Sequence, residues 1–264
     1  MTAKRFTAIV LAADRHDNDP LLEASGVCCK ALLKIDGTPM LQRVISALQS
    51  SEQVETILLA GPAREHLANS EYLAHAIETQ QVGWRAPADS PSNSAWQAMQ
   101  CLADETPVLV TTADNPLLSA EIINCFLAGA VQSGADLAVG IVSFPSVQAK
   151  FPKAKKTVTR FRDGDFCGCN LFAFLTPEAR RVAAVWRKVE QQRKNPLRII
   201  SQLGWWSVLN YLLGRLTLDQ ALTRLSRRLA VDIRPVHLPF PEASIDVDSI
   251  ADQRLVEAIT GREN

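Results

Sequence analysis

The sequence predicts an α/β fold with a mostly parallel sheet covered on both faces by helices, because short apolar runs alternate with longer stretches of helical periodicity. The apolar runs are too short for helices and are typical of buried strands. The expected strands are 6–12, 54–60, 76–82, 108–112 and 137–144. The expected helices are 40–50, 94–102 and 119–133, the last with Ser119 as its N-cap. Ligands of such sheets bind beyond the carboxyl ends of the strands, so the loops after residues 12 and 112 are the first candidates for a site.

The composition changes at Lys150. Residues 150–162 carry six basic residues and no acidic one, and the run Cys-Gly-Cys-Asn-Leu-Phe-Ala-Phe after them indicates another strand. A helical block is expected over 177–229, then a strand over 231–237 and a helix over 250–259. Because we find neither a repeat nor a low-complexity linker, we expect one domain with a helical insertion near its C-terminal end.

The charges balance over the whole chain but not along it. The 264 residues hold 28 lysines and arginines and 28 aspartates and glutamates, so the formal net charge is zero. That balance excludes a protein that coats nucleic acid by bulk charge. Residues 150–230 nevertheless hold 17 basic against 5 acidic residues, a net charge of +12, and the rest of the chain sums to −12. An acidic part suited to recruiting a cation is thus joined to a basic part suited to a phosphorylated or membrane-associated ligand.

The cysteines and the apolar segments indicate the cellular compartment. The six cysteines show no Cys-x-x-Cys spacing, so we expect reduced, mostly buried thiols of a cytoplasmic protein and no metal at Cys167 and Cys169. The basic and apolar N-terminal segment lacks a credible cleavage site, and we interpret it as the first strand. The charge-free stretch between Arg198 and Arg215 is too short to span a bilayer, so no transmembrane helix is expected.

Three charged side chains are candidates for chemistry at the strand ends. Lys30 lies in the loop after the first expected strand, where backbone N–H groups and a lysine can bind phosphates. Asp114 follows the fourth expected strand and Asp248 precedes the C-terminal helix, and a carboxylate at either place can hold Mg²⁺ on phosphate oxygens. Each residue also has a structural explanation: an exposed lysine, a turn former before Asn-Pro, and a helix N-cap.

The order of these motifs resembles the MobA-like nucleotidyltransferases. The motifs are Leu-Ala-Ala at the end of the first strand, Lys-Ala-Leu-Leu from Lys30, Gly-Thr-Pro-Met-Leu, Thr-Ala-Asp-Asn-Pro-Leu-Leu around Asp114, and Ile-Asp-Val-Asp-Ser-Ile-Ala-Asp near the end. The resemblance spans most of 6–145 and returns at 231–259. It implies a Rossmann-like GT-A fold of three α/β/α layers and one nucleotidyltransferase domain over 1–264. Its expected parts are a nucleotide-binding part at 1–149, acceptor-binding strands at 150–175, the basic helical insertion at 176–230, and a C-terminal strand and helix at 231–264.

The resemblance also implies an activity and the residues that carry it. The implied reaction is Mg²⁺-dependent transfer of NMP from an NTP, with GTP or CTP expected in preference to ATP, to a small phosphorylated acceptor, and pyrophosphate is released. The resemblance assigns triphosphate binding to Lys30 and Mg²⁺ binding to Asp114 and Asp248, and catalysis is expected from Lys30, Arg15 and Asp114. The expected nucleotide contacts are Leu11, Ala12, Ala13, Asp14, Arg15, Lys30, Ala60, Asn93, Ser94, Ala113 and Asn170.

The phosphate loop departs from the family pattern at one position. Most members have a glycine after Leu-Ala-Ala, where this chain has Asp14 followed by Arg15. An acid beside a triphosphate is unfavourable unless a cation screens it, so we expect Asp14 to orient Arg15 or to bind the ion. The same departure leaves open a catalytically weakened nucleotide-binding protein as an alternative.

The later segments are expected to supply the acceptor side. Asn170 lies in a Gly-x-Asn strand that resembles a sugar-contacting strand of related transferases. A basic run is the candidate for binding the acceptor's phosphate, and its members are Lys153, Lys155, Lys156, Arg160 and Arg162. The alternative explanation for these charges is a sheet edge protected by lysines.

The helical block has two interpretations. Basic residues flank an apolar, aromatic middle, which is typical of peripheral membrane or lipid contact, here through 195–215 at the inner face of the membrane. The alternative is a helical hairpin that packs its apolar face on the core. Membrane contact would suit a second function class, a GT-A glycosyltransferase that uses a nucleotide-sugar and a lipid-linked acceptor. No nucleic-acid partner is expected, and the sequence does not indicate an oligomeric state.

Overall fold

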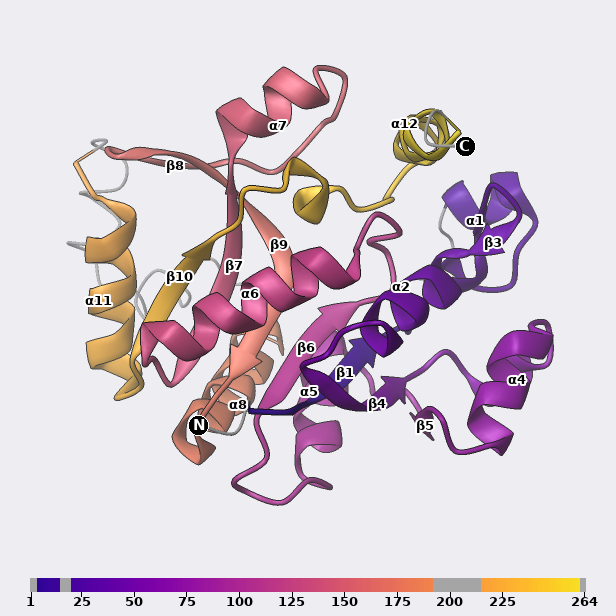
Figure 1. Cartoon of the computed structure of the whole chain (residues 1–264), viewed down its shortest axis with the longest axis horizontal. Coiled ribbons are helices and arrows are strands. Elements are labelled where there is room, and N and C mark those ends of the chain that lie inside the picture. Colours follow the sequence, from indigo (N-terminus) through magenta and orange to yellow (C-terminus); the bar gives the residue numbers. More distant parts are fainter. Residues whose placement is uncertain (1–3, 15–19, 192–214, 262–264) are drawn as a thin grey trace.

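One mixed sheet organises the computed structural model, which describes residues 4–14, 20–191 and 215–261. The strand order is β10-β7-β9-β6-β1-β4-β5, and β8 pairs with β9 (Figure 1). The strands of this sheet are β1 (Phe6–Leu11), β4 (Val54–Ala60), β5 (Gly83–Arg85), β6 (Val108–Thr112), β7 (Leu137–Ser143), β8 (Thr159–Phe161), β9 (Gly164–Phe174) and β10 (Ile233–His237).

The sheet is mostly parallel, as the sequence predicts. Strand β1 pairs in parallel with β4 and β6, and β4–β5 and β10–β7 are parallel pairs too. Strand β9 runs antiparallel between β6 and β7. All six residues of β1 are buried, because a parallel sheet of this kind is covered on both faces. The carboxyl ends of β1, β4, β6 and β7 therefore meet at one edge, together with the start of β9.

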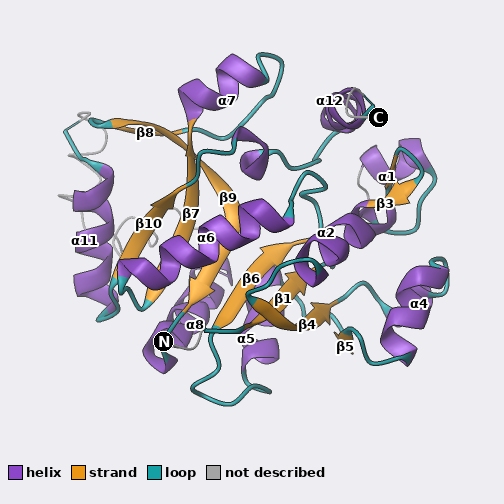
Figure 2. Ribbon diagram, in the orientation of Figure 1, coloured by secondary structure: helices purple, strands orange, loops and turns teal. Residues whose placement is uncertain are grey.

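Helices α2 (Met40–Gln49) and α6 (Ala120–Ser133) cover one face of the sheet (Figure 2). The hydroxyl of Ser119 accepts a hydrogen bond from the N–H of Ile122 at 3.2 Å, which confirms the predicted N-cap. Helix α6 ends at Gly134, whose φ of 66° is the left-handed conformation that favours glycine. Apolar side chains of both helices pack on the even-numbered face of β1, which presents Phe6, Ala8 and Val10, so this half of the layered fold follows from the predicted elements. The helix residues that pack there include Met40, Leu41, Val44, Ile45, Leu48, Ile122, Ile123, Phe126 and Leu127.

Helices α5 (Pro91–Met99), α8 (Pro177–Gln191) and α11 (Leu218–Leu229) cover the other face. Helix α5 begins three residues before the predicted 94, because Ser90 caps it and Pro91 occupies its first turn. The Arg180 side chain of α8 is buried and donates to the carbonyls that end α5 and follow it, those of Met99, Leu102, Ala103 and Thr106. Arg180 is therefore a structural residue and not part of a basic surface.

The predicted strand over 76–82 is wrong. Helix α4 (Glu71–Glu78) occupies the first three residues of that range, and the strand of this region, β5, begins only after it, at Gly83. Ser70 caps the helix, and the buried residues Leu73 and Ala76 lie three positions apart on its inner face. The apolar residues of this run thus follow a helical period and not the two-residue period of a strand.

Short elements gather around the edge where the parallel strands end. They include elements that the sequence did not predict. They are α1 (Pro20–Ser25), the 3₁₀ turn η1 (Lys30–Leu32), the hairpin of β2 (Lys34–Ile35) and β3 (Thr38–Pro39), α3 (Arg64–Leu67), α7 (Phe144–Lys150) and the 3₁₀ turn η2 (Pro241–Ser244). The C-terminal helix, α12 (Ile250–Thr260), matches its prediction to within one residue and lies beside α1 and β3 (Figure 1).

The helical insertion is described only in part. In the described ranges, no helix has both the length and the apolar character needed to cross a membrane. Ala179 and Ala183 of α8 and Leu222 of α11 pack on the core. Residues 192–214 lie outside the described residues, and with them nearly all of the proposed membrane-contact segment 195–215.

Candidate active site

The loop after β1 forms a small cavity at the strand-end edge. The cavity measures about 40 Å³ and is lined by Leu11, Ala12, Ala13, Asp14, Lys30, Ala31, Ala113 and Asp114. The backbone N–H of Ala12 donates to the carbonyl of Ala60, and that of Ala113 to the carbonyl of Leu11, both at 3.0 Å. These bonds join the ends of β1, β4 and β6. Leu11 and Ala12 are buried and belong to the core.

Gly61 permits a close approach of two of these loops. Its φ is +84°, and a Cβ at this position would lie 3.1 Å from the backbone nitrogen of Ala13. A side chain at position 61 would therefore push the loop after β4 away from the loop after β1. The sequence offers the signal for this residue, since the Gly-Pro pair directly follows a predicted strand.

Both the backbone N–H and the side-chain ammonium of Lys30 contact carboxylates. Its backbone N–H donates to the Asp14 carboxylate, at 3.0 Å from Oδ1 and 3.3 Å from Oδ2. Its ammonium lies 3.3 Å from Oδ2 of Asp114 and contacts Oδ1 of Asp248. The Lys30 side chain is only 15% exposed. Asp14, which replaces the usual glycine of the phosphate loop, therefore fixes the start of η1 and with it the position of Lys30.

Asp114 is oriented by its own strand and by the C-terminal segment. The hydroxyl of Thr112 donates to Oδ1 of Asp114 at 2.5 Å, and the N–H of Val247 donates to the Asp114 carbonyl at 2.9 Å. The side-chain amide of buried Asn115 donates to the carbonyl of Ala243 at 2.8 Å. Residues 243–247 are thereby fastened to the loop after β6. Sequence reasoning missed Thr112 and Asn115, although both belong to the Thr-Ala-Asp-Asn-Pro motif.

Asp248 does not cap the C-terminal helix. The N-cap of α12 is Ser249, whose hydroxyl accepts from the N–H of Asp252 at 3.3 Å. The Asp248 side chain, 68% exposed, lies instead against Lys30. The structure thus excludes the N-cap explanation for Asp248 and brings together the three charged residues that the sequence singled out.

The electrostatics of the cluster favour the charged form of Lys30. Burial alone would lower the pKa of the Lys30 ammonium, but the charges of Asp114 and Asp248 and their hydrogen bonds hold that pKa above its ordinary value. Two residues before Asp248, burial raises the pKa of the Asp246 carboxyl, and an ion pair with Lys156 opposes that rise. Because its pKa is raised, the Lys30 ammonium is a permanent cation between the carboxylates of Asp114 and Asp248 at neutral pH.

The remaining predicted nucleotide contacts are distributed more widely. Ala60 ends β4 beside the first loop. Asn93 and Ser94 lie in the first turn of α5. Asn93 donates to Oδ1 of Asp89 at 2.6 Å, while the Ser94 hydroxyl is buried and accepts from the N–H of Ala88. Arg15 lies outside the described residues.

Asn170 interrupts β9 near the same edge. Its φ of 52° is left-handed, and the register with β7 shifts around it, from Val139 opposite Phe172 to Ile141 opposite Gly168. The β6–β9 pairing places Val110 opposite Phe172, so a continued register puts Asn170 level with Thr112, next to Asp114. The irregular backbone thus lies level with the end of β6, and the sugar contact of Asn170 stays a prediction.

The cysteines are free thiols in buried and exposed positions. All six are free, and Cys29, Cys167 and Cys169 are buried, whereas Cys28 and Cys101 are exposed. Burial raises the pKa of Cys29 and of Cys169 to about 12, so both remain protonated thiols at neutral pH. Across the described residues, no group of three or more His, Cys, Asp or Glu side chains is arranged to hold a metal ion.

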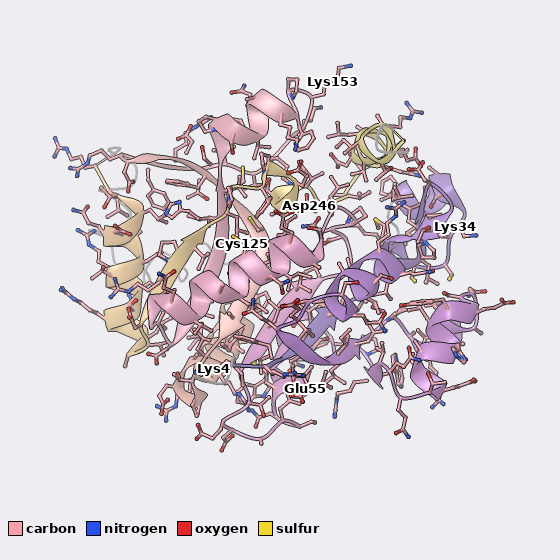
Figure 3. The ribbon with its side chains drawn as sticks, viewed as in Figure 1. Lys4, Lys34, Glu55, Cys125, Lys153 and Asp246 are labelled. Atoms are coloured by element: carbon pink, nitrogen blue, oxygen red, sulfur yellow. The ribbon has the colours of Figure 1, made fainter. Side chains whose placement is uncertain are left out.

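The basic run at 153–162 does not act as one surface. Lys156 is nearly buried, with 9% of its side chain exposed, and contacts Asp246, while Arg160 lies 3.8 Å from Asp165 across the β8–β9 turn. Lys153, Lys155 and Arg162 are exposed. Figure 3 shows Lys153 extending outward from the loop after α7 and Asp246 beneath it, on the segment between η2 and α12. All three residues of β8 pair with β9, and this short edge strand carries a charge at Arg160.

The fold and the site define a Rossmann-like α/β protein whose strand-end edge carries a lysine between two aspartates. The model of the MobA-like NTP transferase domain matches residues 8–161, more than half of the sequence. The chain belongs to this family of nucleotidyltransferases, as its motifs predict.

Solved structures support the same assignment. A hypothetical transferase from Thermus thermophilus is 30% identical, with a TM-score of 0.78 over 94% of this chain and 99% of the other. Two more distant structures share the fold. One is a CMP:2-keto-3-deoxy-manno-octonic acid synthetase complexed with CTP, at 16% identity and a TM-score of 0.56, covering 99% of this chain and 100% of the other. The other is a 4-diphosphocytidyl-2C-methyl-D-erythritol synthase from Anaerococcus prevotii, at 12% identity and a TM-score of 0.59, covering 98% and 97%. The comparison with curated proteins found no match.

Proposed function

We propose that the chain is a Mg²⁺-dependent nucleotidyltransferase that transfers NMP from GTP or CTP to a small phosphorylated acceptor and releases pyrophosphate. The observation that carries the proposal is the contact of the Lys30 ammonium with both Asp114 and Asp248. A phosphate-binding cation and two potential metal ligands converge there, beside the loop after β1. The related structures with cytidine nucleotides in their names support CTP as a substrate.

The residues present fit a magnesium ion. Mg²⁺ commonly takes one or two carboxylates and completes its octahedron with water and substrate phosphate oxygens. Asp114 and Asp248 already converge on one positive group, and Thr112 orients the Asp114 carboxylate. These two aspartates would hold the ion, which when bound would neutralise charge on the transferring phosphate.

The chain's own residues would then position the substrates. The Lys30 ammonium exchanges its carboxylate partners for phosphate oxygens of the NTP, while its backbone remains fixed by Asp14. Backbone N–H groups of the first loop bind the triphosphate, with Arg15 as a further proposed cation. An acceptor phosphate oxygen attacks the α-phosphorus in line, a new P–O bond forms, and the bond to the β-phosphate oxygen breaks as pyrophosphate leaves. The chain supplies charge and orientation, with no covalent intermediate.

The remaining parts of the site complete the proposal. Ala60, Asn93 and Ser94 border the place proposed for the base, and Asn170 at the β9 irregularity would contact the acceptor. The proposal retains one catalytic domain over 1–264 and a cytoplasmic location.

A binding panel followed by a product assay tests this function. Thermal shifts with each of the four NTPs, with and without MgCl₂, are expected to show stabilisation by GTP or CTP that requires the metal. The best nucleotide is then incubated with a set of phosphorylated acceptors while pyrophosphate is measured, and Asp114→Ala is expected to abolish release without loss of the fold. Release of NDP from a nucleotide-sugar would instead indicate a glycosyltransferase. Nucleotide binding without turnover of any acceptor would favour the catalytically weakened alternative, and no binding would exclude both enzymes.

A further inference from the structure

A second lysine–carboxylate pair lies next to the first. The ammonium of Lys156 contacts Oδ1 of Asp246, and the two side chains are 9% and 27% exposed. This pair is more buried than the contact between Lys30 and Asp248, whose carboxylate is 68% exposed. The basic run suggested Lys156 as a ligand of the acceptor phosphate. A nearly buried lysine is unsuited to that role, because its charge is already paired with the Asp246 carboxylate.

The two pairs are joined through one short segment. Asp246 and Asp248 are separated by Val247, which is fully buried and whose N–H donates to the carbonyl of Asp114. Lys30 comes from the loop after β1, whereas Lys156 comes from the segment between α7 and β8. Each lysine therefore ties a different part of the chain to the same three residues. Asp114 and Asp248 are also close enough to Asp246 to raise its pKa.

We infer that Lys156 is a positioning residue for the metal ligand Asp248, acting through its ion pair with Asp246, an inference that rests on the proposed function. When Lys30 turns to the phosphates of a bound nucleotide, it leaves the carboxylates. Lys156 has no such second role and keeps segment 246–248 against the loop of Asp114. The pair thus holds Asp248 in place in the state in which the metal is needed.

The test compares charge-neutral pairs of substitutions. K156M/D246N removes one charge of each sign, so the field at Asp248 changes little while the bridge is lost. The control is K150M/E242Q, which removes the ion pair between the end of α7 and η2. K156R keeps the charge and is expected to retain the function of the bridge. Circular dichroism and thermal unfolding check the fold of every variant.

The readout is the gain in nucleotide affinity that Mn²⁺ provides. Calorimetry gives the Kd of GTP or CTP, whichever the thermal panel selects, once with EDTA and once with Mn²⁺. In K156M/D246N, the metal-dependent gain in affinity is expected to be about tenfold smaller than in the unsubstituted chain, while the metal-free Kd stays unchanged. A roughly tenfold effect is the low end of what supporting residues of metal sites contribute. A role in stability alone would lower the melting temperature and leave the gain intact.

Each outcome decides the inference. A gain in K156M/D246N within about twofold of the unsubstituted chain overturns it, as does an equal loss in K150M/E242Q. If K156M/D246N does not fold, K156Q, which keeps the length and a hydrogen bond, takes its place with the same criterion. Absence of any metal-dependent gain in the unsubstituted chain would instead overturn the proposed function, and the inference with it.

Discussion

Lys30 occupies the place proposed for a metal ion, so its removal has a counterintuitive consequence. In the absence of nucleotide, a divalent cation has to displace the ammonium from Asp114 and Asp248 before it can bind. We predict that Lys30→Met binds Mn²⁺ alone more tightly than the unsubstituted chain does. The same variant is expected to bind metal-free nucleotide more weakly, because the phosphates lose their cation.

The contacts of Lys30 set the size of the effect. The hydrogen bond to Asp114, at 3.3 Å and with 23% of that side chain exposed, contributes about 1.5 kcal/mol, the lower end for bonds to charged groups. The contact with the exposed Asp248 adds about 0.5 kcal/mol, as for a surface ion pair. Their sum of about 2 kcal/mol corresponds to a Kd for Mn²⁺ that is roughly 30-fold lower in the variant.

Electron paramagnetic resonance of free Mn²⁺ measures this Kd directly, with no nucleotide present. The control is Lys34→Met, an exposed lysine in the neighbouring strand β2, labelled in Figure 3, whose removal is expected to leave the Kd unchanged. Equal or weaker Mn²⁺ binding by Lys30→Met would refute the idea that the ammonium and the metal share one site. Tighter binding by both variants would show only a general effect of net charge.

Further predictions concern the supporting residues. Asp14→Ala removes the acceptor of the Lys30 N–H and is expected to lower the free energy of unfolding in urea by about 1 kcal/mol and to weaken nucleotide binding, and an unchanged nucleotide Kd would contradict this role. Arg180→Ala removes the side-chain donor to four backbone carbonyls, two of which keep a backbone donor, and is expected to cost about 3 kcal/mol of unfolding free energy, against less than about 0.5 kcal/mol for exposed Arg181→Ala; similar losses in the two variants would contradict the structural role. Burial raises the pKa of Cys169 from 9.0 to about 12, so its contribution to stability is complete below pH 9 and is lost as pH rises toward 12, with the same sign as that of Lys30. Unfolding measured from pH 8 to 11 is expected to show this decline and a shallower one in Cys169→Ser; an unchanged slope in that variant would argue against the assignment.

Elements with strong local signals could be predicted from the sequence. Strands β4 and β6 have their predicted bounds, and Ser119 caps α6 as its sequence indicates. Each strand contains a short apolar run, 57–60 in β4 and 108–110 in β6, and the helix carries a cap, an acidic first turn and a terminal glycine. In each case the local preference agrees with the tertiary environment.

The region around α4 shows why periodicity alone failed. The segment 76–82 is short and partly apolar, so its sequence is compatible both with a strand and with the end of a helix. The decisive signal was Ser70 with Glu71 behind it, a helix start that lies six residues before the expected strand.

The charged residues of the site could be predicted individually, but their contacts could not. Lys30, Asp114 and Asp248 were found from motifs at strand ends and helix starts. The Lys30 ammonium contacts both carboxylates only because segments more than 80 residues apart pack together. The same holds for the ion pair of Lys156 with Asp246, which sequence spacing does not indicate. The basic run had suggested Lys156 as a phosphate contact instead.

Asp14 is the clearest case of a departure that the structure explains. In the sequence it stands where a glycine is usual and suggests an impaired phosphate loop. In the structure its carboxylate binds the N–H of Lys30, so the acid supports the residue that is proposed to bind phosphate. A bond between residues 16 apart in a loop has no signature in composition or period.

The central claim is that Asp114 holds a metal ion that serves a bound nucleotide. The most direct measurement is calorimetry of GTP and CTP with Mn²⁺ and with EDTA, on the unsubstituted chain, on Asp114→Asn and on the control Glu121→Gln in the first turn of α6. The proposed site predicts a metal-dependent gain in affinity for the unsubstituted chain and the control, and its loss in Asp114→Asn, with the metal-free Kd preserved. An equal gain in all three proteins would contradict it.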